Sequence, residues 1–139
     1  MSEKIYSKEI PSDPDLMPEV ESFVLNIAKG LNLPPDKYNN LALSVAEAIS
    51  NSMLHGNKND KTKKVRINIY VDDNYLKISF KDEGKGFNPS KIPDPTKPEN
   101  ILKDSGRGIH IMRSFLDDLQ FKFHEDGTEI ILILKLNNN

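Results

Sequence analysis

Hydrophobic and polar positions alternate at the start of the chain and then change to a helical spacing. Residues 4–10 alternate between polar and apolar side chains, which predicts a short strand that ends at Pro11. Ser12 or Asp13 can cap a helix that follows, with Pro14 in its first turn, where a missing N–H group is harmless. The apolar face of this first helix is predicted to comprise Val20, Phe23, Val24, Ile27 and Leu31.

A second helix and a hairpin follow. The helix is predicted to begin at Asp36, after two helix-breaking prolines, and to end at residues 55–57. Its buried face is predicted to comprise Leu41, Val45, Ala48, Ile49, Ser52 and Met53. Residues 65–71 and 76–80 alternate strictly, and residues 72–74 are typical of a turn, so the pattern predicts two paired strands.

The apolar residues have no regular spacing over residues 88–105. Prolines and charges there predict a long, mobile surface loop that acts as a lid. A third helix is then predicted from an apolar face of Ile109, Met112, Phe115, Leu116 and Leu119. Residues 120–125 and 128–136 predict a last hairpin. This order of elements predicts one domain over residues 1–139 with an α+β fold. The expected form is a two-layer α/β sandwich, with helices on one face of a mixed, mostly antiparallel sheet.

Composition excludes several classes of protein. Hydrophobic residues make up 37% and charged residues 29% of the chain, which is typical of a globular protein. The longest apolar run, residues 130–134, is far shorter than the roughly 20 residues of a membrane-spanning helix, and residues 1–10 lack the pattern of a signal peptide. The absence of cysteine excludes disulfides and thiolate metal sites and suits a cytoplasmic location. The net charge of −2 makes nucleic acid a poor partner.

Candidate chemistry appears first on the second helix. Glu47, Asn51 and His55 follow one another at four-residue spacing, so they are expected to project from one face of the helix. A carboxylate can orient a hydroxyl or accept its proton, and an amide oxygen can complete a magnesium shell made mainly of phosphate and water oxygens. Taken alone, such a pair is more often a solvated helix face than a catalytic site.

Two glycine-rich segments offer further candidates. Asp82, Gly84 and Gly86 follow a strand, where an aspartate can accept a hydrogen bond from an exocyclic amine and glycine lets a flat ligand approach. The simpler interpretation of these three residues is a tight turn. Residues 105–108, Ser-Gly-Arg-Gly, begin the third helix, where free N–H groups favour anions. Their simpler interpretation is a loop hinge with a helix cap.

The order and spacing of these segments resemble a known family. Residues 43–56 resemble the N-box of the GHKL ATP-binding family, and residues 82–87 resemble its first glycine box. Residues 105–113 are similar to its second glycine box, and Gly127-Thr128 is similar to its closing Gly-Thr pair. The resemblance covers nearly the whole chain and implies a Bergerat-type ATP-binding fold.

Within that family, the chain resembles the bacterial anti-sigma factors that are serine/threonine protein kinases. The resemblance implies that ATP and magnesium bind beneath the lid at about residues 88–105. It also implies that the domain phosphorylates a STAS-domain anti-anti-sigma protein and otherwise sequesters a sigma factor in the cytoplasm. Family kinases often form homodimers, and the sequence leaves the oligomeric state open. A nucleotide-gated binding module without kinase activity stays open as an alternative.

The resemblance also implies a role for each matching residue. Glu47 would act as the catalytic base, Asn51 would bind magnesium, and Asp82 would accept the adenine amine with support from Thr128. The remaining nucleotide contacts would come from Gly84 and Gly86 at the base, and from Gly106, Arg107 and Gly108 at the phosphates.

Overall fold

The computed structural model describes residues 3–84 and 112–136. The helices of this part are η1 (Pro14–Leu16, a 3-10 turn), α1 (Met17–Lys29), α2 (Pro35–Ser50) and η2 (Asn51–Gly56, a π-helix). The strands are β1 (Lys4–Pro11), β2 (Lys64–Val71), β3 (Tyr75–Lys81), β4 (Asp118–His124) and β5 (Gly127–Lys135). The predicted lid falls outside the described residues, as does the start of the predicted third helix up to residue 111.

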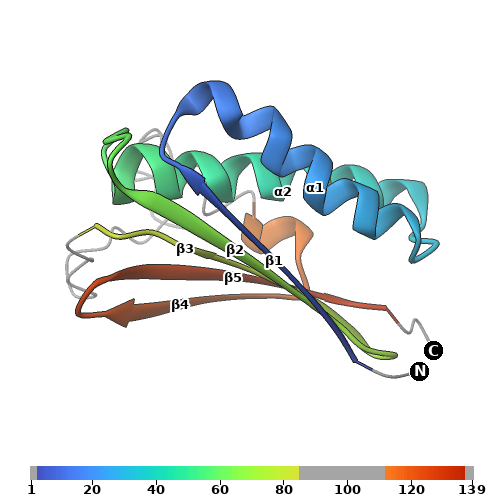
Figure 1. Ribbon diagram of the computed structural model, residues 1–139. Coiled ribbons are helices and arrows are strands. Elements are labelled where there is room, and N and C mark those ends of the chain that lie inside the picture. The colour runs from blue at the N-terminus through green and yellow to red at the C-terminus, as the bar shows by residue number, and fades with distance from the viewer. Residues whose placement is uncertain (1–2, 85–111, 137–139) are drawn as a thin grey trace.

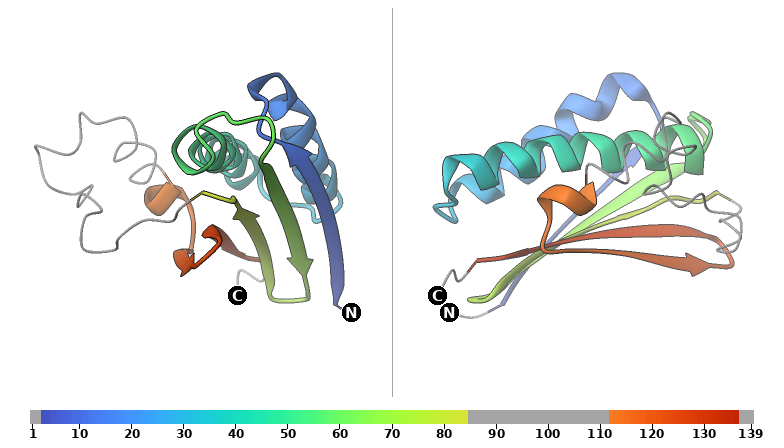
Figure 2. Two further views of the ribbon diagram at one scale, coloured as in Figure 1. Left: turned by 60° about the vertical axis from the view of Figure 1, so that its left-hand side comes forward. Right: turned by 180° about the vertical axis from the view of Figure 1, so that it is seen from behind.

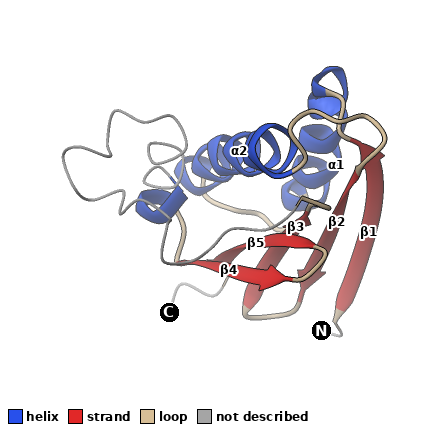
Figure 3. Cartoon of the chain, turned by 90° about the vertical axis from the view of Figure 1, so that its left-hand side faces the viewer, coloured by secondary structure: helices blue, strands red, loops and turns tan. Residues whose placement is uncertain are grey.

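The described elements form two layers. α1 and α2 lie side by side on one face of the sheet, which confirms the predicted arrangement (Figures 1 and 2). Figure 3 views the same two layers from one end of the sheet. The strand order is β1-β2-β3-β5-β4. All four neighbouring pairs are antiparallel, so the strands described here include no parallel pair.

The core lies between the helices and the sheet. Alternate residues of β2 and β3 are buried, and the side chains of Ile67, Phe80 and Ile130 meet across three neighbouring strands. From α2 and η2 the predicted face is buried in full: Leu41, Val45, Ala48, Ile49, Ser52 and Met53. Burial of a large apolar side chain stabilises the fold by about 1.5–3 kcal/mol, so this interface holds the helix layer in place. In the described part of the chain, no helix is long and apolar enough to cross a membrane.

The third helix ends earlier than predicted. Residues 112–115 are helical, whereas Leu119, which the pattern assigned to the helix, lies in β4. Asp117 causes the change, because its N–H donates to the carbonyl of Ile133 (3.0 Å) and its carboxylate accepts from the N–H of Lys135 (2.7 Å). These two bonds draw the chain onto β5 before another helical turn can form.

The end of the second helix has a geometry that the sequence pattern did not predict. α2 changes at Asn51 into the π-helix η2, and the N–H of Asn57 donates to the carbonyl of Ser52, five residues earlier (2.9 Å). A π-helix has more residues per turn than an α-helix, so four-residue spacing no longer keeps side chains strictly on one face. His55 is therefore offset from Asn51, whereas the N–H of Asn51 still donates to the carbonyl of Glu47 as in an α-helix. All three side chains are partly buried.

Asn57 joins three separate segments just after η2. Its side-chain amide donates to the hydroxyl of Ser12 (2.6 Å) and to the carbonyl of Lys64 (3.0 Å). Its side-chain oxygen accepts from the N–H of Glu83 (2.7 Å). Only 1% of Asn57 is exposed, and its bond to Ser12 is fully buried, where water cannot replace it. The residue thereby fixes the end of the helix against the chain that follows β3.

Asn57→Ala should lower the free energy of unfolding by about 3 kcal/mol, because it removes three hydrogen bonds and leaves the buried hydroxyl of Ser12 without this partner. Chemical denaturation measures the change. Asn39→Ala is the matched control, since Asn39 is exposed on α2 and should alter stability by less than about 0.5 kcal/mol. Equal effects of the two substitutions would contradict the role given to Asn57.

Candidate functional site

Asp82 lies immediately after β3 and is the central polar residue of the candidate site. Only 2% of it is exposed. Its Oδ1 accepts hydrogen bonds from the N–H groups of Gly84 (2.9 Å) and Thr128 (3.1 Å). The backbone N–H of Asp82 donates in turn to the carbonyl of Thr128 (3.0 Å). Within the described residues, both donors to the carboxylate bond to Oδ1, so a ligand that donates a hydrogen bond would bind at Oδ2.

The electrostatic surroundings of Asp82 favour a ligand with an N–H donor. Burial raises the pKa of this carboxyl, although the backbone donors of Thr128 and Gly84 and the charges of Lys81 and Lys63 act in the opposite direction. A buried carboxylate that lacks full compensation gains from every further hydrogen bond it accepts. The exocyclic amine of adenine is a donor of this kind.

Three glycines allow three segments to meet at Asp82. A Cβ atom on Gly56 would overlap the Asp82 carboxylate, and one on Gly84 would overlap the carbonyl of Gly56. Gly127 has a φ of +156°, and a Cβ atom there would overlap the carbonyl of Asp82. Only glycine permits this close approach of the η2 end, the chain after β3 and the start of β5.

Gly84 was predicted as a site residue, whereas Gly56 and Gly127 were assigned only to a helix end and a turn. The sequence did place both in segments that resemble family motifs. Spacing alone could not show that they contact one carboxylate, because they are far apart along the chain. The contact depends on the pairing of β3 with β5 and on the path of η2.

Glu47 and Asn51 lie on the helix that runs toward Asp82. Glu47 is in the last turn of α2, and Asn51 begins η2. Asn51 lies five residues and Glu47 nine residues before Gly56, so at a helical rise of about 1.5 Å per residue they stand on the order of 8 and 14 Å from it along the helix axis. The helix therefore places Asp82, Asn51 and Glu47 in order along one direction. This is the order in which an elongated ligand with a base at one end would meet them.

The residues present suit magnesium only in combination with a bound phosphate. Within residues 3–84 and 112–136, no group of three or more His, Asp or Glu side chains could hold a metal ion. The amide oxygen of Asn51 is a hard ligand of the kind that magnesium accepts, while phosphate oxygens and water would have to supply the rest. The donor set fits a metal that arrives with a nucleotide. Gly86, Gly106, Arg107 and Gly108, the other predicted nucleotide contacts, lie outside the described residues.

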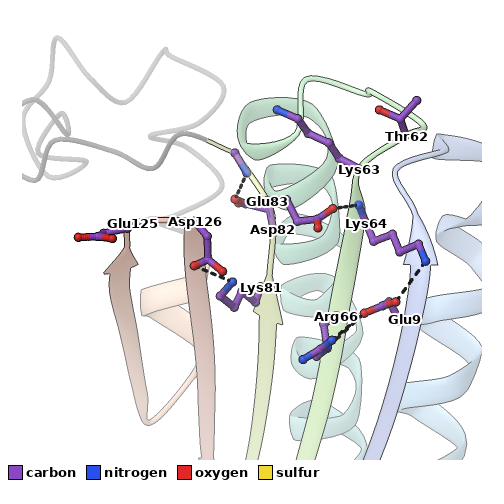
Figure 4. Close-up of a pocket in the computed structure, with 11 residues that line it drawn as sticks. Glu9, Thr62, Lys63, Lys64, Arg66, Lys81, Asp82, Glu83, Glu125 and Asp126 are labelled. Carbon is purple, nitrogen blue, oxygen red and sulfur yellow. Dashed lines mark hydrogen bonds and ion pairs between the residues drawn. The ribbon is translucent and has the colours of Figure 1, made fainter.

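A cavity of about 620 Å³ lies behind the Asp82 segment, on the sheet face that the helices leave open (Figure 4). Asp82 and Gly84 line one side of it, but Glu47 and Asn51 do not. Its other side chains are charged and largely paired: Glu9 with Lys64 and Arg66, and Lys81 with Asp126. A flat, mostly apolar base would gain little in such surroundings, so the candidate site is the helix-facing side of Asp82.

Gly127→Ala should destabilise the fold by about 2 kcal/mol or more, because the new methyl group cannot avoid the backbone of Asp82. Gly30→Ala is the matched control. There the new Cβ would make an ordinary contact, 3.5 Å from the carbonyl oxygen of Ile27, and the backbone is helical, so stability should stay equal or rise by about 0.5 kcal/mol. Thermal unfolding of both variants measures the difference.

Asp82→Asn should stabilise the ligand-free fold relative to the wild type, and increasingly so as pH rises from 4 to 7. The raised pKa means that the folded protein holds the Asp82 proton more tightly than the unfolded chain. This stabilisation is complete below the ordinary aspartate pKa of about 3.9 and is lost as pH rises through the raised value. Asparagine remains neutral and keeps an oxygen for the two backbone donors.

The measurement is the difference in melting temperature between Asp82→Asn and the wild type as a function of pH. Glu125→Gln is the control, since Glu125 is an exposed residue of the β4–β5 turn. A difference for Asp82→Asn that shrinks as pH rises would contradict the assignment.

The chain is similar to known proteins over most of its length. The family model described as "Histidine kinase-like ATPase domain" matches residues 10–134. The chain is 31% identical over 109 residues to an anti-sigma F factor of Anoxybacillus flavithermus, covering 75% of this chain and 73% of the relative. It is 35% identical over 100 residues to an anti-sigma F factor of Bacillus cytotoxicus, covering 68% of this chain and 67% of the relative.

Solved structures agree at the level of the fold. The histidine kinase domain of a blue-light activated histidine kinase from Erythrobacter litoralis EL346 superposes with a TM-score of 0.59 at 16% identity. The match covers 91% of this chain and 62% of that protein, so the chain spans less than two thirds of it. The extent of the family match and the identity to the anti-sigma F factors show that this chain belongs to the histidine kinase-like ATPase domain family.

Proposed function

We propose that this protein is an ATP-dependent serine/threonine protein kinase that acts as an anti-sigma factor. Its target would be a STAS-domain anti-anti-sigma protein, and it would also sequester a sigma factor. Family membership supports ATP binding, and the names of the relatives support the anti-sigma role. The observation that carries the proposal is the buried Asp82 carboxylate held at the end of the helix that bears Asn51 and Glu47.

Each residue of the site would have a separate role in the reaction. Asp82 would accept the adenine amine, with Thr128 beside it, and Gly84 would leave room for the base. Magnesium, held by Asn51 and the phosphates, would neutralise charge that develops during transfer. Glu47 would accept the proton of a serine or threonine hydroxyl while the hydroxyl oxygen bonds to the γ-phosphorus. The bond from that phosphorus to the β–γ bridging oxygen would break and release ADP.

Two exposed leucines support a protein substrate rather than a small one. Leu43 is 53% exposed and Leu54 is 48% exposed, and they lie on α2 and η2 on either side of Glu47 in the chain. A hydroxyl that reaches Glu47 would bring its neighbouring residues close to these side chains, and apolar surface of this kind is typical of protein contacts.

The proposal includes a single domain over residues 1–139, with a lid at about residues 88–105, and leaves a homodimer open.

The alternative is a nucleotide-gated binding module of the same fold. In that case ATP or ADP would change only the affinity for a partner, and no phosphate would be transferred. Glu47 would then be dispensable for every measurable property except local stability. The two functions differ in the fate of the γ-phosphate, which makes them directly separable.

Glu47→Gln should leave the affinity for magnesium-ATP nearly unchanged and slow phosphoryl transfer by roughly 100-fold or more, the usual contribution of a general base. The assay follows label from γ-labelled ATP to a STAS-domain protein encoded beside this chain. Glu21→Gln is the matched control, a partly buried glutamate on α1 that should transfer phosphate at the wild-type rate. Wild-type protein that binds ATP and partner but transfers no label would favour the binding module.

A further inference from the structure

Phe123 continues a row of apolar side chains on β4 beyond the core. Leu119, Phe121 and Phe123 occupy alternate positions, so they point to the same face of the sheet. Leu119 and Phe121 pack against the core cluster under the helix layer. Phe123 lies one step further along this row, and 36% of it is exposed. Its ring is nearly parallel to that of Phe121, with centroids 6.5 Å apart and an interplanar angle of 14°.

The register of the sheet places Phe123 beside the candidate base site. Phe123 pairs directly with Thr128 of β5, and both side chains lie on the helix-facing side of the sheet. Directly opposed residues have Cβ atoms about 5 Å apart. The N–H of Thr128 donates to Asp82 on the other side of β5, so one strand, β5, separates Phe123 from the carboxylate.

We propose that Phe123 is a further binding residue of the site and forms an aromatic wall for the purine base held by Asp82. The inference rests on the proposed function, since it takes the ligand of Asp82 to be adenine. A carboxylate can hold the edge of a base, but it leaves the apolar faces of the base to be covered by something else. An aromatic ring that is still one third exposed beside that edge supplies such a surface.

The proposal gives Phe123 a role distinct from that of Asp82. Stacking does not depend on which hydrogen-bonding groups a base carries, so Phe123 would add affinity, while Asp82 would select adenine. The ring lies at the base end of the site, far from Glu47. Its loss should therefore weaken the binding of ATP, ADP and adenosine by the same factor.

The sharpest test uses the absence of tryptophan from the sequence. Phe123→Trp introduces a single tryptophan, whose emission should change when saturating magnesium-ATP binds, because the indole would contact the base. Tyr75→Trp is the matched control: Tyr75 is also 36% exposed, but it lies at the opposite end of the sheet, and its emission should stay constant. Calorimetry confirms that each variant binds ATP.

A second variant measures the contribution to affinity. Phe123→Ala should raise the dissociation constants of ATP, ADP and adenosine by roughly 10-fold each, and Phe123→Tyr should restore them. Constant emission of Phe123→Trp during ATP binding, or unchanged affinity in Phe123→Ala, would overturn the proposal. Failure of the wild type to bind ATP is a different outcome, since it would remove the proposed function on which this inference rests.

Discussion

The contacts of one buried carboxylate organise the end of the molecule where the candidate site lies. Asp82 accepts two backbone hydrogen bonds on one oxygen, and the three segments around it approach so closely that each requires a glycine. Burial opposes the charge of this group and raises its pKa. The described residues therefore stabilise the negative charge of Asp82 only in part. A ligand that donates a hydrogen bond to this carboxylate would stabilise the charge further.

The position of the helix layer relative to the sheet is also fixed by contacts around Asp82. Gly56 ends the π-helix against Asp82, and Asn57 then bonds to the ends of two strands and to Glu83. The side chain of Glu83 also accepts from the N–H of Lys64, at the start of β2. These contacts set the axial position of the helix that carries Asn51 and Glu47. The distance between Asp82 and Glu47 thus depends on a small number of polar contacts.

Most of the fold followed from the sequence because its causes are local. Alternation over residues 65–71 and 76–80 corresponds to β2 and β3, and the apolar stripe of the second helix is buried as expected. The predicted extent of the third helix was wrong because Asp117 bonds to β5, a contact between residues distant in the chain. The π-helix was not predicted, since it changes the spacing of hydrogen bonds without changing the pattern of apolar residues. Gly56 and Gly127 had no individual role in the prediction, because their contacts form only after the sheet is assembled.

The pairing of β3 with β5 joins residues 75–81 to residues 129–135. Thr128 reaches Asp82 only when this pairing is complete, and closing so long a stretch of chain is among the costlier steps in forming a sheet. The hairpin of β2 and β3, in contrast, forms between neighbours. A partly folded chain can therefore contain both helices and that hairpin while lacking the bonds between Thr128 and Asp82. Nucleotide affinity would then be acquired late in folding, as a property of the finished sheet rather than of any fragment of it.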